Sequence, residues 1–504
     1  MEKLERQFGI LLKFPILSLL LIGIGAIIIR LIFFQNELIF YSDNLTYFQS
    51  AIDISIAGRS SIILPNDGWP QILSIFFKFL NSQNFLEYMN LQSYLTMSFS
   101  TLTIIPLYYF SKKFVSTSFA LICTIFFVFE PRIILNSLNG TTDPLFILLV
   151  VISLALVVQK NKYLIGISFV TVALASSIRS EGLFLIPALC LMVIHQFKLS
   201  KKSIFQCIIF LLITVLILLL YSMQRIENYG NDYLVSRIII SSSSFLEQTG
   251  NDSNLIFLKI GQSFYLFFGF LGKLMIPYLG IFVPIGIILF LKGKNNQKLL
   301  LIIPAFFMIL PSLYAYTVPA LDSRYLFPIL PILSIFGAFT CMKFLEKIKY
   351  KKIVLVIIII IIITLSSLFL VYKNNDNDKQ NEFLELADIV NKKTDTILYI
   401  QINPVLSYLN PAGLLELEEF PIMSSHYNKN SIIKIAKYVD NEDFFSSMKE
   451  NGITHIVIDK EINNPLVINL IFDNYEKYKN LKKIFDSEES GFDYKIQIFE
   501  IIQN

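Results

Sequence analysis

The chain has 504 residues, of which 54% are apolar and only 16% are charged, and its mean hydropathy is +0.62. This balance excludes a water-soluble protein of this size, because a soluble chain interleaves its apolar runs with polar faces. The net charge of +4 says little by itself, since the informative quantity in a membrane protein is the side on which each charge lies. No nucleic-acid partner is expected.

Eleven apolar runs follow one another along the first three quarters of the chain, and each is expected to form a spanning helix. They cover residues 10–34, 92–111, 114–129, 144–159, 163–178, 183–197, 204–221, 275–291, 299–318, 325–342 and 353–372. The first is too long for a cleaved signal peptide and is expected to be a retained span. The predicted fold class is a polytopic α-helical membrane protein with about 11 transmembrane helices.

The loops between these runs sort by charge. Short lysine-rich loops such as 198–202 and 343–352 fall on one face, which the positive-inside rule makes cytoplasmic. The other face carries the long segments at about 35–91 and 222–274, and nearly all acidic residues of the membrane part lie on that face. The sequence therefore predicts a multi-pass protein of the cell membrane with its N-terminus in the cytoplasm and its chemistry outside.

The character of the sequence changes after residue 372. Helical patterns at 382–391 and 431–438 alternate there with strand-like runs. The strand-like runs cover 396–400, 454–459 and 494–501. This alternation predicts a membrane domain at 1–372 and a small extracytoplasmic α/β domain at 373–504.

The first polar cluster opens the first outer loop, with Asp43 and, one helical turn later, Tyr47. Asp43 follows the first span closely and is expected to lie near the membrane surface. A carboxylate there could accept a proton from a nucleophile or hold a divalent cation near a lipid head group. An ordinary loop acid or a helix cap is the alternative.

The outer ends of two successive spans carry a second cluster, with Glu130, Arg132 and Asp143. Asp143 precedes Pro144, a common helix start, so capping would explain Asp143 without any function. Glu130 and Arg132 are harder to assign to structure alone, because charges at a span end beside a proline usually face a cavity or each other.

Two further arginines lie at outer span ends, Arg179 in a turn with Glu181 and Arg324 directly before Tyr325. Arg179 could bind a phosphate with two parallel hydrogen bonds, while Glu181 holds it in place. Snorkelling to the interface is the alternative for both arginines. Three outer arginines and three or four outer carboxylates on one membrane face together indicate a site for an anionic lipid-linked ligand.

At these residues the chain resembles the glycosyltransferase C (GT-C) superfamily, the polytopic transferases that use lipid-phosphate-linked sugars. Protein mannosyltransferases and lipid A aminoarabinose transferases belong to it. The matching motifs, in the family's order, are Asp43 with Tyr47, Ala51 and Gly58, then Pro131–Pro144, Arg179–Gly182 and Arg324–Pro328. The Trp-Trp-Asp motif of oligosaccharyltransferase subunits is absent, since Trp69 is the one tryptophan, and Asn44 stands in place of a second acid in the first loop.

The resemblance implies transfer of a sugar, with inversion, from a polyprenyl-phosphate or dolichyl-phosphate donor to a lipid, protein or glycan acceptor outside the cytoplasm. Membrane lipid is the other expected partner. Asp43 would be the catalytic base or the ligand of a divalent cation, Mg or Mn, and Asp143 and Glu130 are candidates for a second acid. Arg179, Arg324 and Arg132 would hold the donor phosphate, supported by Tyr47, Glu181 and Tyr325.

Two other functions stay open at this point. A transporter or flippase for lipid-linked saccharides would place ionisable residues near mid-membrane and show internal repeats, whereas the charges here cluster at span ends. A non-catalytic scaffold of the same fold is the other. Three Asn-x-Ser/Thr sequons, at Asn44, Asn139 and Asn251, lie on the predicted outer face.

Overall fold

The protein is described by a computed structural model that covers residues 15–35, 43–60, 62–80, 82, 85–232, 253–293, 297–317, 322–374, 377–393, 397–399, 433–435, 454–459 and 471–502. The chain forms two compact units. The first comprises Met1–Phe34, Asp53–Ile75 and Gln92–Tyr372, and the second comprises Gln35–Ile52, Phe76–Leu91 and Lys373–Asn504. The sequon at Asn251 lies outside the described residues.

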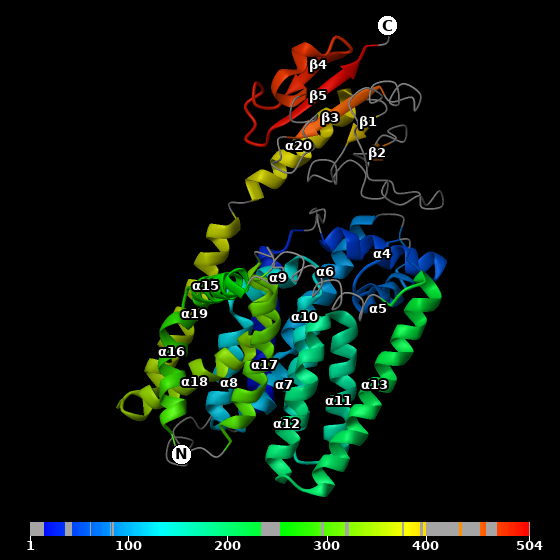
Figure 1. Ribbon diagram of the computed structural model, residues 1–504. Helices are drawn as coiled ribbons and strands as arrows, with labels where there is room; N and C mark the ends of the chain where they lie inside the picture. The colour runs from blue at the N-terminus through cyan, green and yellow to red at the C-terminus, as the bar shows by residue number, and fades with distance from the viewer. Residues whose placement is uncertain are drawn as a thin grey trace. The chain divides into compact units, whose positions relative to one another are not determined.

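Helices dominate the described part of residues 15–374 (Figure 1). Long apolar runs adopt this form because a helix satisfies its own backbone hydrogen bonds in lipid. In chain order the elements are α3 (Pro15–Phe33), α4 (Asp43–Ala57), α5 (Gly68–Phe77), α6 (Phe85–Leu102), α7 (Ile104–Ser111), α8 (Thr117–Val128), α9 (Pro131–Leu138), α10 (Asp143–Val157), α11 (Lys162–Ile178), the 3-10 turn η2 (Ser180–Phe184), α12 (Leu185–Phe197), α13 (Lys201–Tyr229), α15 (Ser253–Met275), α16 (Leu279–Lys292), α17 (Leu299–Ala315), the 3-10 turn η3 (Ser323–Ile329), α18 (Leu330–Glu346) and α19 (Lys351–Asn374).

Six helical segments within the described ranges are long and apolar enough to cross a membrane. They are Pro15–Phe33, Ser180–Phe197, Lys201–Tyr229, Leu255–Met275, Ser323–Glu346 and Lys351–Lys373. The pair α8 and α9, bent by 54° at the break before Pro131, is a further candidate, and α10, α11, α16 and α17 are shorter apolar helices. The chain is therefore a multi-pass membrane protein, while the count of about eleven spans stays a prediction.

The central helix of the first unit is α18, and 94% of the candidate span that it forms with η3 is buried. Both α8 and α16 pack against it. Gly286 of α16 lies so close that an added Cβ would be 2.0 Å from the Phe336 carbonyl oxygen. Only 22% and 28% of the spans of α13 and α19 are buried. The central position of α18 fixes η3, which directly precedes it, against the helices that form the site.

Helix α5 is anchored to the bundle through a tryptophan. Trp69 is fully buried, and its Nε1 donates to the Gly140 carbonyl oxygen at 3.2 Å. Gln92 Nε2 of α6 donates to the same oxygen at 2.8 Å. The turn between α9 and α10, which leads into Asp143, is thus held by both α5 and α6.

The C-terminal part contains a five-stranded sheet in the order β2-β1-β3-β5-β4. Its elements are α20 (Asn377–Lys393), β1 (Ile397–Tyr399), β2 (Ile433–Ile435), β3 (His455–Asp459), the 3-10 turn η4 (Tyr475–Lys477), β4 (Leu481–Asp486) and β5 (Ile496–Ile501). β1 pairs in parallel with β2 and β3, and β5 pairs antiparallel with β3 and β4. β3 is buried along its whole length and forms the middle of the sheet.

The strands predicted at 396–400, 454–459 and 494–501 correspond to β1, β3 and β5. The helix predicted at 431–438 is wrong within its described residues, because 433–435 form β2. Ile433 and Ile435 alternate with Lys434, which suits a strand, and β1 supplies its hydrogen-bonding partner. The hydrogen bonds between β2 and β1 therefore outweighed the local helical preference of these residues.

Candidate functional site

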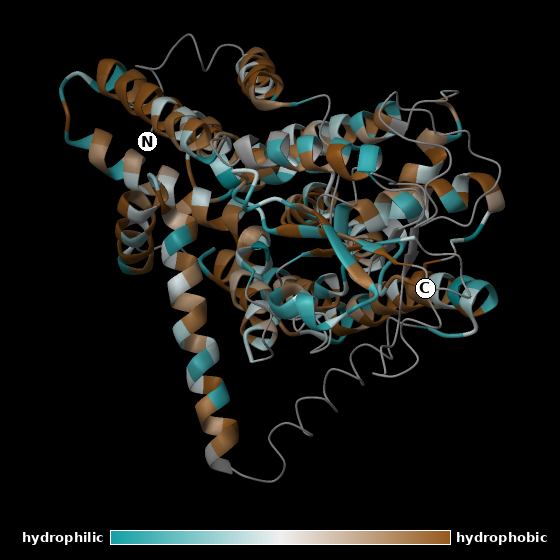
Figure 2. Cartoon of the chain, turned by 90° about the horizontal axis from the view of Figure 1, so that it is seen from above, coloured by the Kyte–Doolittle hydropathy of each residue, from teal (hydrophilic) through white to brown (hydrophobic). Residues whose placement is uncertain are grey.

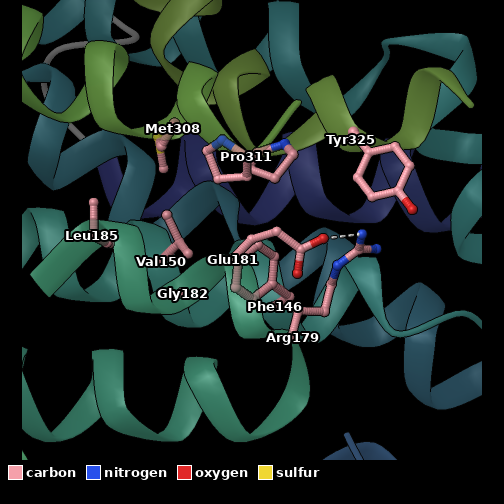
Figure 3. A pocket seen from close by; sticks show the side chains of 10 residues that line it. Phe146, Val150, Arg179, Glu181, Gly182, Leu185, Met308, Pro311 and Tyr325 are labelled. Atoms are coloured by element: carbon pink, nitrogen blue, oxygen red, sulfur yellow. Dashed lines mark hydrogen bonds and ion pairs between the residues drawn. The ribbon is translucent and has the colours of Figure 1, made fainter. Parts of the chain in front are cut away.

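A small pocket, partly open to its surroundings, lies between two walls of the first unit (Figure 3). One wall comes from α10, η2 and α12, and the other from α17 and η3. The lining residues are Phe146, Val150, Arg179, Glu181, Gly182, Leu185, Met308, Pro311, Tyr325 and Pro328. The lining is largely apolar with a few polar groups, as in pockets where such groups orient a mainly apolar ligand.

The Arg179 turn (residues 179–182) results from a break between α11 and α12. Arg179 ends α11 with an extended backbone, at φ −144° and ψ 127°, and η2 follows immediately. Gly182 is required in this turn because an added Cβ would lie 2.8 Å from the Ser176 backbone nitrogen. Figure 3 shows the Arg179 and Glu181 side chains meeting at the pocket wall, opposite Tyr325.

Arg179 is held between two carboxylates that differ in burial. Its Nη1 forms an ion pair with Asp143 Oδ1, and its Nη2 lies 2.7 Å from Glu181 Oε1. The Asp143 side chain is fully buried, whereas 20% of the Glu181 side chain and 15% of the Arg179 side chain are exposed. The guanidinium carbon also lies 5.8 Å from the ring centroids of Phe146 and Tyr325, within the range of cation–π attraction.

Asp143 is fixed from behind by neutral side chains. Its Oδ2 accepts a hydrogen bond from Asn136 Nδ2 at 3.1 Å, and Thr141 Oγ1 donates to Asn136 Oδ1 at 2.9 Å. The helix start predicted at Asp143 is confirmed, but Thr142 is the N-cap of α10 and Asp143 is its first helical residue, so the capping interpretation of Asp143 is wrong. A buried carboxylate needs its cation, so Asp143 serves to orient Arg179.

The fold brings together four of the residues singled out in the sequence: Asp143, Arg179, Glu181 and Tyr325. The snorkelling alternative for Arg179 is wrong, because its guanidinium is mostly buried and paired with carboxylates on both sides. Among the described residues of this cluster, one cation and two carboxylates carry a formal charge of −1. An incoming anion would therefore have to displace one carboxylate from Arg179.

Glu130 and Arg132 form a separate cluster. Glu130 is the buried N-cap of α9, and its carboxylate accepts a hydrogen bond from Ile133 N at 2.9 Å and lies 3.3 Å from Arg132 Nη1. Arg132 Nη1 also donates to the carbonyl oxygens of Leu274 and Ile276 at the C-terminal end of α15. A cation there complements the helix dipole. The geometry thus gives both residues structural tasks, and neither lines the pocket.

Arg324 pairs within its own turn, since its Nε lies 2.5 Å from Asp322 Oδ2, and 34% of its side chain is exposed. Its neighbour Tyr325 lines the pocket, whereas Arg324 does not. Asp43 is the exposed first residue of α4, and Tyr47 lies one turn further along. Both belong to the second unit, and their catalytic roles stay predictions.

A second buried ion pair escaped the sequence reasoning. Arg225 Nη1 of α13 lies 2.9 Å from Asp67 Oδ1, and the two side chains are 0% and 2% exposed. The Tyr221 hydroxyl lies within hydrogen-bond distance of this carboxylate and 3.2 Å from the Ser177 carbonyl oxygen. Arg225 Nη2 also donates to the Leu64 carbonyl at 2.5 Å. The pair joins the segment before α5 to α13, next to the Arg179 turn.

The segment around Asp67 touches the Arg179 turn directly. A Cβ added to Gly68 would lie 2.7 Å from the Ser177 carbonyl oxygen, so only glycine fits there. With its amide oriented to satisfy its neighbours, Asn66 accepts a hydrogen bond from Ser180 N at 3.3 Å. The predicted span at 204–221 ends too early, because α13 runs on to Tyr229 with the charge of Arg225 neutralised inside the protein.

Arg30 of α3 is another buried cation that the sequence reasoning missed, and its side chain is fully enclosed. It donates to Ser137 Oγ at 3.0 Å and Ser100 Oγ at 2.8 Å, and also to the carbonyl oxygens of Ala26 and Val128. These bonds tie the first span to α6, α8 and α9. An arginine inside an otherwise apolar run was the available signal.

No group of three or more His, Cys, Asp or Glu side chains among the described residues is placed to hold a metal ion. The Asp143 oxygens, moreover, are engaged by Arg179 and Asn136. A divalent cation, Mg or Mn, at Asp43 stays a prediction.

No family model matches the chain, and no curated protein matches it in sequence. Solved structures match its fold. ArnT from Cupriavidus metallidurans in the apo state aligns with a TM-score of 0.58 and 10% identity, over 95% of this chain and 97% of that one. The same protein bound to undecaprenyl phosphate gives 0.56 and 11% over the same shares. The Archaeoglobus fulgidus oligosaccharyltransferase in the apo form gives 0.52 and 9%, over 90% and 70%. The chain has the fold of the GT-C glycosyltransferases.

Proposed function

We propose that this protein is a membrane glycosyltransferase that moves a sugar from a polyprenyl-phosphate-linked donor to a lipid, protein or glycan acceptor outside the cytoplasm. The observation that carries the proposal is Arg179, a cation held at the wall of a largely apolar pocket by one buried and one partly exposed carboxylate. The likeness in fold to an ArnT bound to undecaprenyl phosphate supports the same ligand class.

Arg179 would bind the donor phosphate by exchanging one partner. Asp143 is fully buried and stays in place, whereas Glu181 is partly exposed and can swing away. A phosphate that replaces Glu181 on Nη2 would receive a charge-assisted hydrogen bond, the stronger kind, from a guanidinium whose orientation is already set. Tyr325 faces the same guanidinium and would line the path of the donor.

In the proposed reaction, the acceptor hydroxyl oxygen attacks the anomeric carbon of the sugar, and the bond from that carbon to the phosphate oxygen breaks. The electron pair leaves with the polyprenyl phosphate, whose charge Arg179 stabilises. The hydroxyl proton passes to a general base, for which Asp43 is the candidate. Attack from the face opposite the phosphate inverts the configuration of the sugar.

The proposed topology has about eleven spans, with a cytoplasmic N-terminus and the region 373–504 as an extracytoplasmic α/β domain. The positive-inside distribution of loop lysines supports this orientation. It places the Arg179 turn at the outer ends of α11 and α12, where a lipid-linked donor and an outer acceptor can meet.

The test is sugar transfer by the purified protein in lipid, with radiolabelled polyprenyl-phosphate hexoses and mixed acceptors. Arg179→Gln is expected to lower the transfer rate by about 10²-fold or more, the usual loss when one stabilising donor at a developing charge is removed. Arg59→Gln, which changes an exposed arginine of the first outer segment, is the matched control and keeps the wild-type rate.

Equal transfer rates for wild type and Arg179→Gln would show that the pocket takes no part in the reaction. Absence of transfer with every donor, together with movement of a labelled lipid-linked saccharide across sealed vesicles, would establish the transporter alternative instead.

A further inference from the structure

Helix α15 has the smallest buried share of the six candidate spans in the described ranges, at 11%. It also runs in a different direction from the bundle. Figure 1 shows α15 end-on, while α11, α12 and α13 are seen along their lengths, and Figure 2 shows it as the long helix that extends from the body. Length and composition would allow α15 to be a span, but nearly all of it falls in the outer segment predicted at about 222–274, and its direction crosses that of the spans.

Helix α15 has an exposed apolar side and a basic side. At 3.6 residues per turn, Phe257, Phe264 and Phe268 fall within about 40° of one another, and they are 73%, 47% and 63% exposed. We call these three residues the phenylalanine ridge. Lys259 and Lys273 fall on the side roughly opposite to the ridge, and residues 253–275 contain no acidic side chain.

A third side of α15 is fixed to the bundle. Phe267 and Leu274 are buried, and Phe270 stacks on Tyr316 with ring centroids 5.2 Å apart. Arg132 binds carbonyl oxygens at the C-terminal end of the helix. These contacts hold the orientation of α15 and leave the phenylalanine ridge exposed.

We propose that α15 lies in the plane of the lipid leaflet on the side of the Arg179 turn, at the boundary between head groups and acyl chains. The phenylalanine ridge would enter the acyl chains, while Lys259 and Lys273 reach the lipid phosphates, as in other interfacial helices. The apolar surface continues onto α16, where Ile281 is 67% exposed. Lipid is therefore the occupant that the charge pattern and the adjoining surface favour.

This placement sets the depth of the pocket relative to the lipid phosphates. Tyr316, which stacks on Phe270 of α15, meets the Tyr325 ring edge-on at 6.3 Å, and Tyr325 faces Arg179. A helix held at the interface would thus keep Arg179 at a defined level near the phosphates. The inference goes beyond the proposed sugar transfer and holds equally for a protein of this fold that only binds lipid phosphates.

The test is tryptophan quenching in bilayers of phosphatidylcholine brominated at shallow or deep acyl positions. The variants Phe257→Trp, Phe264→Trp and Phe268→Trp each add one reporter, and the wild-type protein with its buried Trp69 gives the background. Val356→Trp, Ile361→Trp and Leu368→Trp, at lipid-facing positions of α19, form the matched spanning series, whose outer members differ in depth by about 18 Å at 1.5 Å per residue.

The three α15 reporters are expected to show one common profile, quenched best by the shallow bromines, while the α19 series changes from position to position. A depth that varies along α15 as it does along α19 would make α15 a span and overturn the proposal. Absence of quenching by either lipid, with the α19 series quenched, would show that protein covers the ridge and would equally overturn it.

Discussion

The two carboxylates that pair with Arg179 differ in role. Asp143 anchors the guanidinium, whereas Glu181 can be exchanged for a phosphate. Asp143 has lost all contact with solvent, and its second oxygen is bound to Asn136, so moving it would expose an uncompensated charge to the protein interior. Glu181 keeps a fifth of its side chain exposed and can find water as an alternative partner. Breaking the ion pair with Asp143 therefore costs more free energy than breaking the one with Glu181, because Asp143 is more deeply buried.

At this scale, Glu181→Gln is expected to tighten the binding of undecaprenyl phosphate, by roughly tenfold, because it removes a charged competitor for Arg179 whose hydrogen bond is worth about 1.5–3 kcal/mol. Asp143→Asn is expected to weaken binding and to lower the thermal midpoint, since it removes the partner that orients the guanidinium. Titration with undecaprenyl phosphate measures the affinity of each purified variant, and thermal unfolding measures the midpoint. Weaker binding by Glu181→Gln would mean that Glu181 helps to hold the phosphate.

At the scale of elements, the Arg179 turn depends on a neighbour from a distant part of the chain. Asp67, directly before α5, forms the buried pair with Arg225, and Gly68, the first residue of α5, makes the close approach to Ser177. Helix α13 supplies Arg225 and, one turn before it, Tyr221. The turn is therefore shaped by α11 and η2 but held in position by α5 and α13.

A double-mutant cycle on Asp67 and Arg225 tests this coupling. Asp67→Asn or Arg225→Met alone is expected to destabilise the protein by about 3–5 kcal/mol, because each leaves one buried charge without its partner. The double variant is expected to lose clearly less than the sum. Unfolding midpoints in detergent measure the three variants against Arg59→Met as a surface control, and strictly additive losses would contradict a coupled pair.

At the scale of the whole molecule, the side on which each loop lies decides what the pocket can meet. The lysine-rich loops would face the cytoplasm, and the Arg179 turn and the region 373–504 would face outward. With the opposite orientation the Arg179 turn would face the cytoplasm, whereas the proposed donor and acceptor lie on the outer side, so the proposed reaction could not occur.

Single cysteines at Lys160 and Lys479, both exposed, test the orientation after Cys123, Cys190, Cys207 and Cys341 are replaced by alanine. Lys479→Cys is expected to react with a membrane-impermeant maleimide in sealed right-side-out vesicles, whereas Lys160→Cys reacts only after permeabilisation. The reverse pattern would show that the topology is inverted. Reaction of both cysteines before permeabilisation, in tight vesicles, would place both on the outside.

Much of the site was predictable from local patterns. Arg179 and Glu181 belong to one turn that interrupts two apolar runs, and Tyr325 opens a third run, so their position at span ends follows from hydropathy alone. Glu130 and Arg132 carry the same local signal, and the structure places Glu130 at the start of α9 and Arg132 at the end of α15. Local pattern places a charge at the membrane boundary and leaves its partner undecided.

The sequence by itself determined that this chain crosses the membrane many times, because long uncharged runs have no other stable environment. It also placed strands in the C-terminal part through their residue alternation and apolar content. Only the tertiary structure decided that Asp143 serves Arg179, that Asp67 neutralises Arg225, and that α15 crosses the direction of the spans. These outcomes depend on contacts between residues far apart in the chain, and such contacts leave no periodic trace in the sequence around either partner.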